Sequence, residues 1–183
     1  RVVDSPGLEI KRAVGEAWAP GNRMRNVSRR TDLWDSVGSE LYGICIGGHD
    51  DVTPERSQEL ARRVSIRNNI IRGVSNTTTD DRSTMGIIST SVEVDMSANF
   101  VSDVSSTSQL CEALYTKASF GRVSDNIVID GGQNSNAIAI KGKLKYAPSS
   151  EKLEVSRNIL RARNQVGALG ITIFGPTTDV SVE

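Results

Sequence analysis

The sequence predicts an all-β fold in which short parallel strands stack coil upon coil. The first observation is a repeat, since an alternating apolar run, an asparagine and a second apolar run return along the 183 residues. The marker asparagines are Asn22, Asn69, Asn99, Asn126 and Asn158, at intervals of 47, 30, 27 and 32 residues. Repeats of this length are typical of solenoids, in which each unit buries its apolar face against its neighbours.

The second observation is that the apolar residues within each repeat alternate with the period of two that is typical of a strand. After each marker and a variable polar stretch comes a further alternating run. These runs are residues 41–46, 85–89, 113–117, 137–141 and 169–174. All are too short for a helical repeat. Three short strands per coil are therefore expected, with like strands of adjacent coils about 4.8 Å apart.

The marker asparagines are predicted to be structural rather than catalytic. A sharp bend between two strands often needs a positive φ, which asparagine tolerates better than most residues. In stacked coils the side-chain amides can also hydrogen-bond one another in a ladder. Inward rows such as Ile66, Val123 and Val155 would then fill one continuous core. The earliest repeat is broken, because residues 8–10 and Asn22 are separated by an insertion.

Three runs share a glycine followed by alternating isoleucine: Gly-Ile-Cys-Ile at 43–46, Gly-Ile-Ile-Ser at 86–89 and Gly-Ile-Thr-Ile at 170–173. With the five markers, they make residues 8–183 resemble a right-handed parallel β-helix of the pectate lyase-like superfamily, with about five coils. This resemblance implies a fold more than a function. The superfamily holds polysaccharide lyases, glycoside hydrolases, epimerases, phage tailspikes and non-catalytic adhesins.

Length and composition fit one β-helix domain over residues 1–183, with irregular insertions at 11–40 and 47–63. Basic and acidic residues both number 22, so no general attraction to nucleic acid or to a membrane surface is indicated. No apolar stretch is long enough to span a membrane. Cys45 and Cys111 lie at different phases of the repeat, which predicts neither a disulfide framework nor a metal site, and no cofactor is expected.

The last residues begin another repeat, and a solenoid cut between coils exposes unpaired strand edges. The chain is therefore expected to be a fragment of a longer protein, or to have its open end covered by another chain.

Two insertions hold side chains that could bind a ligand or take part in catalysis. Trp18 and Trp34 lie near a basic run in residues 23–30, where they could stack on sugar rings or simply cover the first coil. In the second insertion His49, the single histidine, precedes two aspartates and a short helix expected to begin at Thr53. His49 could act as a base or metal ligand, but charged residues just before a helix more often form a solvated turn.

Asp103 and Asp130 are the catalytic candidates. Each follows its marker by four residues, so the two carboxylates would stack about 5 Å apart in adjacent coils. Such a pair disfavours joint ionisation and suits a retaining glycosidase. The alternative is structural, because Asp130 opens an ordinary Gly-Gly turn and Asp103 lies where a loop begins.

A second row lies on the outer face of the strand before each marker. Its members are Ser65, Asp95, Arg122, Glu154 and Ser181. Asp95 and Glu154 would lie two coils apart with Arg122 between them, which could supply the base and the cation of a lyase. The alternative is a ladder of ion pairs between coils on a solvated face.

A third row lies on the outer face of the later runs, where the resemblance implies a sugar-binding groove. Tyr115, Lys117, Lys141 and Phe174 would form a neutral-to-basic strip with aromatic platforms, and they are the substrate-binding candidates. A plain surface with scattered lysines is the alternative. The sequence departs from the pectate-cleaving enzymes of the superfamily, because it lacks their calcium-binding aspartate cluster and the paired aspartates of polygalacturonases.

The function expected from these features is polysaccharide binding, with cleavage as a lyase or hydrolase if the acid pair is active. The chain is most similar to the shaft of a phage tailspike acting on bacterial surface glycan, at an extracellular or virion surface. Apolar residues after the markers could face outward and pack a homotrimer; they are Ile70, Phe100, Ile127 and Ile159. Two alternatives remain: a non-catalytic structural or adhesive β-helix, and a secreted monomeric lyase or epimerase.

Overall fold

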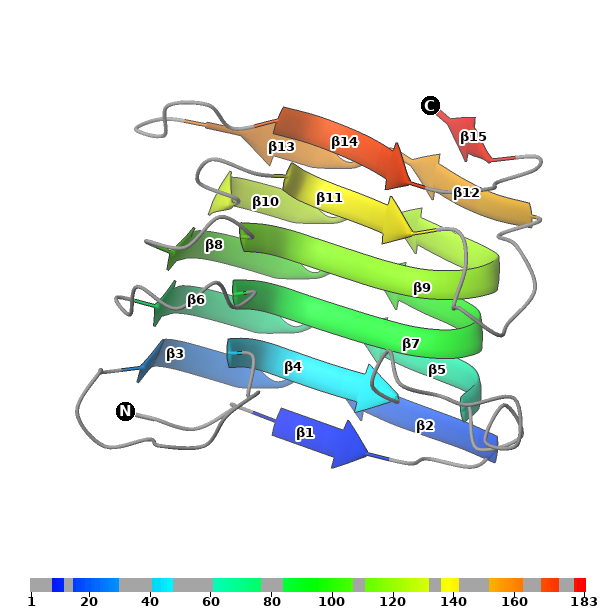
Figure 1. Cartoon of the computed structure of the whole chain (residues 1–183), viewed down its shortest axis with the longest axis horizontal. Coiled ribbons are helices and arrows are strands. Elements are labelled where there is room, and N and C mark those ends of the chain that lie inside the picture. The colour runs from blue at the N-terminus through cyan, green and yellow to red at the C-terminus, as the bar shows by residue number, and fades with distance from the viewer. Residues whose placement is uncertain are drawn as a thin grey trace.

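The structure is a computed structural model that describes residues 8–11, 15–29, 41–47, 61–76, 84–106, 111–131, 136–141, 152–162, 169–174 and 180–183. In these residues every regular element is a strand, and every strand pairs with its neighbours in parallel. The prediction of an all-β, parallel fold is confirmed, and the arrangement is compatible with a β-helix or solenoid (Figure 1). No helix in the described ranges is long and apolar enough to cross a membrane.

The strands form two sheets of stacked coils. The ten-stranded sheet contains β1 (Leu8–Lys11), β2 (Gly15–Pro20), β4 (Leu41–Gly47), β5 (Ala61–Arg67), β7 (Thr84–Ser97), β9 (Cys111–Ser124), β11 (Asn136–Lys141), β12 (Lys152–Ser156), β14 (Leu169–Phe174) and β15 (Ser181–Val182). The five-stranded sheet contains β3 (Arg23–Arg29), β6 (Ile70–Asn76), β8 (Phe100–Ser106), β10 (Ile127–Gly131) and β13 (Ile159–Arg161).

In the middle of the stack, two of the three strands expected per coil are fused. β7 and β9 are each 14 residues long, and each joins a later run to the strand before the next marker around a bend (Figure 1). Gly121 of β9 has a φ of 121°, and a Cβ added there would lie 1.9 Å from the carbonyl oxygen of Val94. Only glycine fits this close approach between coils.

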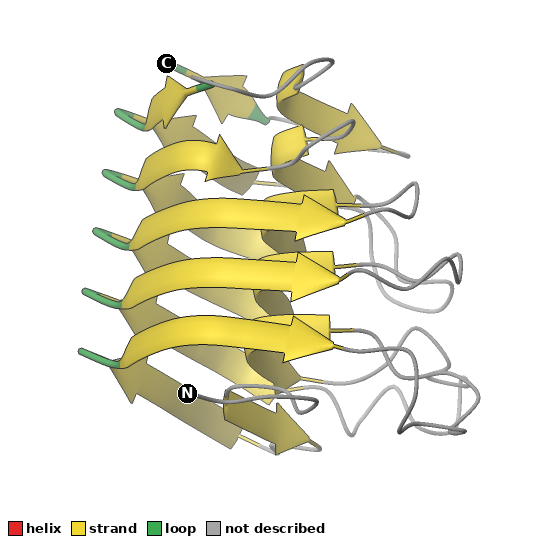
Figure 2. Ribbon diagram, turned by 90° about the vertical axis from the view of Figure 1, so that its left-hand side faces the viewer, coloured by secondary structure: helices red, strands yellow, loops and turns green. Residues whose placement is uncertain are grey.

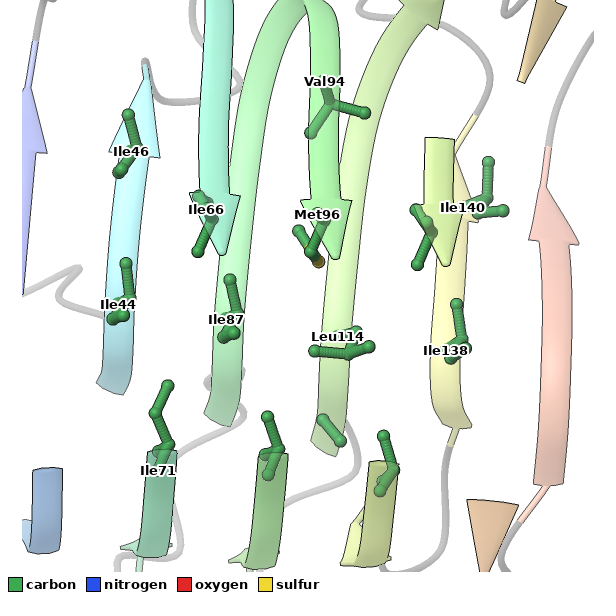
Figure 3. Packing of buried hydrophobic residues seen from close by; sticks show 14 of the residues in the cluster. Ile44, Ile46, Ile66, Ile71, Ile87, Val94, Met96, Leu114, Ile138 and Ile140 are labelled. Carbon is green, nitrogen blue, oxygen red and sulfur yellow. The ribbon is translucent and has the colours of Figure 1, made fainter. Parts of the chain in front are cut away.

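The core lies between the two sheets and runs along the stack as continuous apolar rows (Figure 3). The predicted inward row is confirmed, because Ile66, Val123 and Val155 are fully buried and share one register position in the stack, with Met96 in the coil between Ile66 and Val123. A second row from the later runs includes Ile44, Ile87, Leu114 and Ile138. Each coil therefore buries its apolar side chains mainly against the coils above and below.

The predicted asparagine ladder is present. The Nδ2 of Asn69 donates to the Oδ1 of Asn99 at 2.8 Å, and Asn99 donates in turn to Asn126 at 3.0 Å. Asn22 and Asn158 extend the ladder at its two ends, each through a bond of 3.0 Å. In the four later markers the Oδ1 also accepts the backbone N–H of the marker before it, and the Nδ2 donates to a main-chain carbonyl; these residues are Asn69, Asn99, Asn126 and Asn158.

The positive φ predicted for the markers belongs instead to the residue before each of them. These residues are Gly21, Asn68, Ala98, Asp125 and Arg157, with φ between 52° and 67°. The turns stack along one edge of the molecule (Figure 2). The expectation of a positive φ at the markers was wrong because each marker amide points inward to the ladder. The residue before the marker therefore adopts the left-handed conformation, whatever its side chain.

The first coil also differs from its prediction. The stretch expected to be an irregular insertion at 11–40 contains β2 and β3, and β1 pairs with β4 rather than forming the strand that precedes Asn22. The strand before Asn22 is β2, whose inward residues are Ala17 and Ala19. Their small side chains concealed the alternation that branched residues show elsewhere. In the second insertion β5 begins at Ala61, while Trp34, His49 and the expected helix at Thr53 lie outside the described residues.

A row of small residues explains the glycine that opens the later runs. Gly43, Gly86, Ala113, Ala137 and Gly170 stack, because the residues flanking them pair in register. A Cβ on Gly86 would lie 2.5 Å from the carbonyl oxygen of Ala113 and 2.6 Å from Cγ1 of Val101. At Gly170 nothing lies closer than Leu160 Cδ1 at 4.0 Å.

We therefore expect Gly86→Ala to lower the free energy of unfolding by about 1–3 kcal/mol through overpacking. Gly170→Ala is the matched control and should change it by less than about 0.5 kcal/mol. Urea denaturation followed by circular dichroism measures both. Equal effects of the two substitutions would contradict the close approach of the two sheets at Gly86.

Candidate functional site

The catalytic candidates Asp103 and Asp130 stack as expected. They lie at the same position of β8 and β10, because Ser102 pairs with Ile129 and Val104 with Gly131. The two residues are therefore one coil step apart, about 4.8 Å between backbones. Asp103 is exposed and accepts a 2.8 Å hydrogen bond from the Ser102 hydroxyl, whereas Asp130 is buried.

Both aspartates also have a local structural reason to be there. Their φ angles are 57° and 50°, and Gly73 fills the same position of β6 with a φ of 72°. Aspartate and glycine are among the few residues that adopt this left-handed conformation readily. The row thus marks a left-handed backbone position repeated along the five-stranded sheet, and a catalytic role for the pair stays a prediction.

The expected sugar-binding strip stacks in the predicted register, but its central side chains are buried. Tyr115 is 7% exposed and Lys117 is 4% exposed. Tyr115 packs in a cluster with Cys45, Met85, Ile88 and Ala139, and the Lys117 ammonium lies 5.4 Å from the centroid of its ring. Neither side chain presents an open face to a ligand in this arrangement.

Lys141 and Phe174 are described through their backbones alone. They pair with each other at the ends of β11 and β14. The substrate-binding role of these two residues, and of Tyr115 and Lys117, stays a prediction.

The row before the markers is confirmed position by position. Ser65 pairs with Asp95, Asp95 with Arg122, Arg122 with Glu154 and Glu154 with Ser181. Trp18 on β2 extends the row beside Ser65. We call the outer face of β2, β5, β12 and the second halves of β7 and β9 the charged face (Figure 1).

Asp95 is the hub of the charged face. Its Oδ2 accepts from Nε of Arg122 at 3.0 Å and from the terminal guanidinium nitrogen of Arg122 at 2.9 Å. Arg67, from the coil below, donates to the same oxygen. The Ser97 hydroxyl donates to Oδ1 at 2.6 Å. One carboxylate therefore joins three successive coils.

These contacts decide the ionisation of Asp95. Burial alone raises the pKa of this carboxyl group, but the hydrogen bonds from Ser97, Arg122 and Arg67 outweigh burial and hold the pKa below its usual value of 3.8. A carboxylate that is stabilised in this way is a weak base, and its oxygens are already occupied. Asp95 therefore suits an ion-pair ladder better than the proton abstraction of a lyase.

Further ion pairs cover the rest of this face and its turn. Arg63 lies 3.4 Å from Glu93, and Arg157 forms a two-pronged pair with Asp125 at 2.7 and 2.9 Å. The hydrogen bond from Arg157 lowers the pKa of Asp125, even though that side chain is 46% exposed. Pairs this exposed contribute more to the order of the side chains than to stability.

Aromatic side chains complete the charged face. Trp18 is 66% exposed, the largest value among the exposed large apolar residues of the described ranges. Phe120 is also exposed and lies on β9, three coil steps from Trp18, about 14 Å along the stack. Aromatic rings beside ordered charged groups form a surface that can hold a ring-shaped polar ligand. In the described part of the chain, no three His, Cys, Asp or Glu residues gather as metal ligands.

Sequence reasoning missed Arg67 and Ser97, two of the three partners of Asp95. Both were within reach, because each lies two residues after a member of the predicted row and side chains two apart share a face. The exposure of Trp18 was not predicted either, because β2 itself was not predicted.

Comparison with protein-family models, curated proteins and solved structures finds no match to this chain.

The lowered pKa of Asp95 predicts how stability depends on pH. Its contribution is present above pH 3.8 and is lost as pH falls from there through the lowered pKa of the folded chain. We expect Asp95→Asn to cost about 1–2 kcal/mol of unfolding free energy at neutral pH. Urea denaturation at a series of pH values should show the difference between wild type and variant shrinking in acid.

Glu93→Gln is the control, because it removes an exposed pair on the same face and should cost less than about 1 kcal/mol. If wild type and Asp95→Asn lose stability in parallel down to the most acid pH, Asp95 is not the charged hub of the folded chain.

Proposed function

We propose that this chain is a right-handed parallel β-helix similar to the pectate lyase-like superfamily, and that it binds polysaccharide on the charged face. The observation that supports the proposal most is the large exposure of Trp18 on a flat strand surface, next to side chains already held by ion pairs. Right-handedness follows the general rule that crossovers between parallel strands are right-handed in about 98% of cases.

The charged face has the chemistry that a sugar chain requires. The indole of Trp18 can stack on the C–H face of a pyranose ring, and the second ring at Phe120 offers another contact further along the stack. Between them Arg67 and Arg122 retain donors for hydroxyl or carboxylate groups. Because Asp95 already orders both arginines, a ligand loses less side-chain entropy on binding.

The bound glycan is proposed to be a bacterial surface polysaccharide, met at an extracellular or virion surface as by a phage tailspike. Binding without turnover is favoured over cleavage. The acid pair Asp103 and Asp130 lies on the five-stranded sheet, while Trp18 lies on the ten-stranded sheet, so one glycan chain would have to contact both faces. Cleavage remains a second candidate because the one-coil step of the pair is close to the carboxylate spacing of retaining glycosidases.

A binding assay with a panel of acidic and neutral bacterial polysaccharides tests the proposal. We expect at least one polysaccharide to be retained in affinity electrophoresis. Trp18→Ala should weaken this retention at least about tenfold, as removal of an aromatic side chain covered by the bound partner does. Ile159→Ala removes an exposed apolar side chain from the other sheet and should leave retention unchanged.

The same panel separates binding from cleavage. Release of reducing ends or unsaturated uronates by wild type, and its loss in Asp130→Asn, would establish the second candidate. A panel in which no polysaccharide is retained, or in which Trp18→Ala binds as wild type does, would contradict glycan binding on the charged face.

A further inference from the structure

The outer face of the five-stranded sheet carries one apolar side chain per coil. Ile70, Phe100, Ile127 and Ile159 stack in register on β6, β8, β10 and β13. Their predicted outward orientation is confirmed, since Ile127 is 36% and Ile159 46% exposed, while Ile70 and Phe100 are partly exposed. We call these four residues the apolar stripe.

Arginines lie along the apolar stripe. Arg23 continues it on β3, and the next outward row holds Arg25, Arg72 and Arg161. The Arg72 guanidinium lies 4.8 Å from the centroid of the Phe100 ring, so cation and stripe form one surface. All four arginines are exposed.

The arginines of the two faces differ in one respect. Four arginines of the charged face and its turn pair with a carboxylate: Arg63 with Glu93, Arg67 and Arg122 with Asp95, and Arg157 with Asp125. Among the described residues, none of Arg23, Arg25, Arg72 and Arg161 has an ion-pair partner. The arginines of the stripe therefore make no ion pair with the described residues, although the carboxyl groups of Asp103 and Asp130 lie one residue beyond the arginine row on β8 and β10.

This charge selects the partner. The two rows themselves contain no carboxylate, and their four arginines outnumber the two neighbouring aspartates, Asp103 and Asp130. A surface that fits the rows must therefore bring its own acidic groups. A second copy that offered the same face would set arginine against arginine. The homotrimer expected from the sequence could use the stripe only by opposing it with a different, acidic face.

The shape of the stripe selects a helix. It is one residue wide, and its four residues span three coil steps, about 14 Å. The apolar stripe of an α-helix repeats about every 5.4 Å, so three turns cover about 16 Å and stay nearly in step with the coils. An extended strand places like-facing side chains about 6.8 Å apart and loses step after one contact. A membrane surface would require apolar side chains spread over two dimensions.

We propose that the apolar stripe binds an acidic amphipathic α-helix of a partner protein, lying along the axis of the stack. Its apolar residues contact the four stripe side chains. Its acidic residues pair with Arg25 and Arg72 at one end and with Arg161 at the other. This inference is independent of the glycan proposal, because it uses the opposite sheet.

The test uses a fluorescent, helix-stapled peptide with leucines at i, i+4, i+7 and i+11 and glutamates beside them. Fluorescence anisotropy should show saturable binding to wild type. Arg72→Glu combined with Arg161→Glu should weaken binding at least about tenfold, as reversal of two charge pairs does. A peptide with lysine in place of glutamate should bind this variant better than it binds wild type.

Arg63→Glu, on the charged face, is the matched control and should leave peptide binding unchanged. Ile127→Ser should weaken binding without altering the circular dichroism spectrum, because its side chain is exposed. Absence of peptide binding would overturn the proposal, and so would an equal loss of binding in Arg63→Glu. It would also be overturned if the peptide did not bind while the stripe was required for one of two other interactions. These are co-sedimentation with vesicles of phosphatidylglycerol and phosphatidylcholine, and formation of a trimer in analytical ultracentrifugation.

Discussion

The constraint on which the structure depends is the burial of one asparagine amide per coil. An unpaired amide in the core would cost several kcal/mol, so each marker must find its neighbours at hydrogen-bonding distance. The ladder meets this demand through bonds of 2.8 to 3.0 Å between successive side chains. Since the ladder fixes one residue of every coil against the next, it fixes the register of the strands on either side. A slip of one residue would leave buried amides unpaired and turn the apolar rows outward.

Register in turn creates the surfaces of the molecule. Residues far apart in sequence, such as Arg67, Asp95 and Arg122, meet because they stand at nearly equal offsets from their markers. The same rule collects Phe100 and Ile127 into an apolar stripe on the other sheet. The charged face pairs arginines with its own carboxylates and presents aromatic rings, while the arginines along the apolar stripe have no ion-pair partner among the described residues. We propose binding rather than turnover for this scaffold with two chemically different faces, since the carboxylate oxygens of Asp95 already accept hydrogen bonds.

The features that the sequence predicts well follow from the same rule. Equal spacing from Asn99 and Asn126 is enough to place Asp95 opposite Arg122, and alternation alone is enough to find the inward rows. The fused strands, the strands of the first coil and the left-handed turn residues are not predictable in this way. Alanines conceal an apolar period, and a turn that accepts Ala98, Asp125 and Arg157 alike has no sequence signature. The burial of Tyr115 and Lys117 also cannot be predicted from the sequence. Alternation gives the direction in which a side chain points but not what covers it.

The most direct test of this account compares Asn99→Ala, in the middle of the ladder, with Asn22→Ala, at its first rung, by urea denaturation. Asn99→Ala removes the acceptor of the Asn69 amide and backbone N–H and the donor to Asn126 and Ile66. Its predicted cost is about 3 kcal/mol or more of unfolding free energy, whereas Asn22→Ala, which loses its bond to Asn69 and a long exposed one to Pro20, should cost about 1 kcal/mol. Equal costs, or an Asn99→Ala variant as stable as wild type, would contradict the claim that the buried amides hold the coils in register.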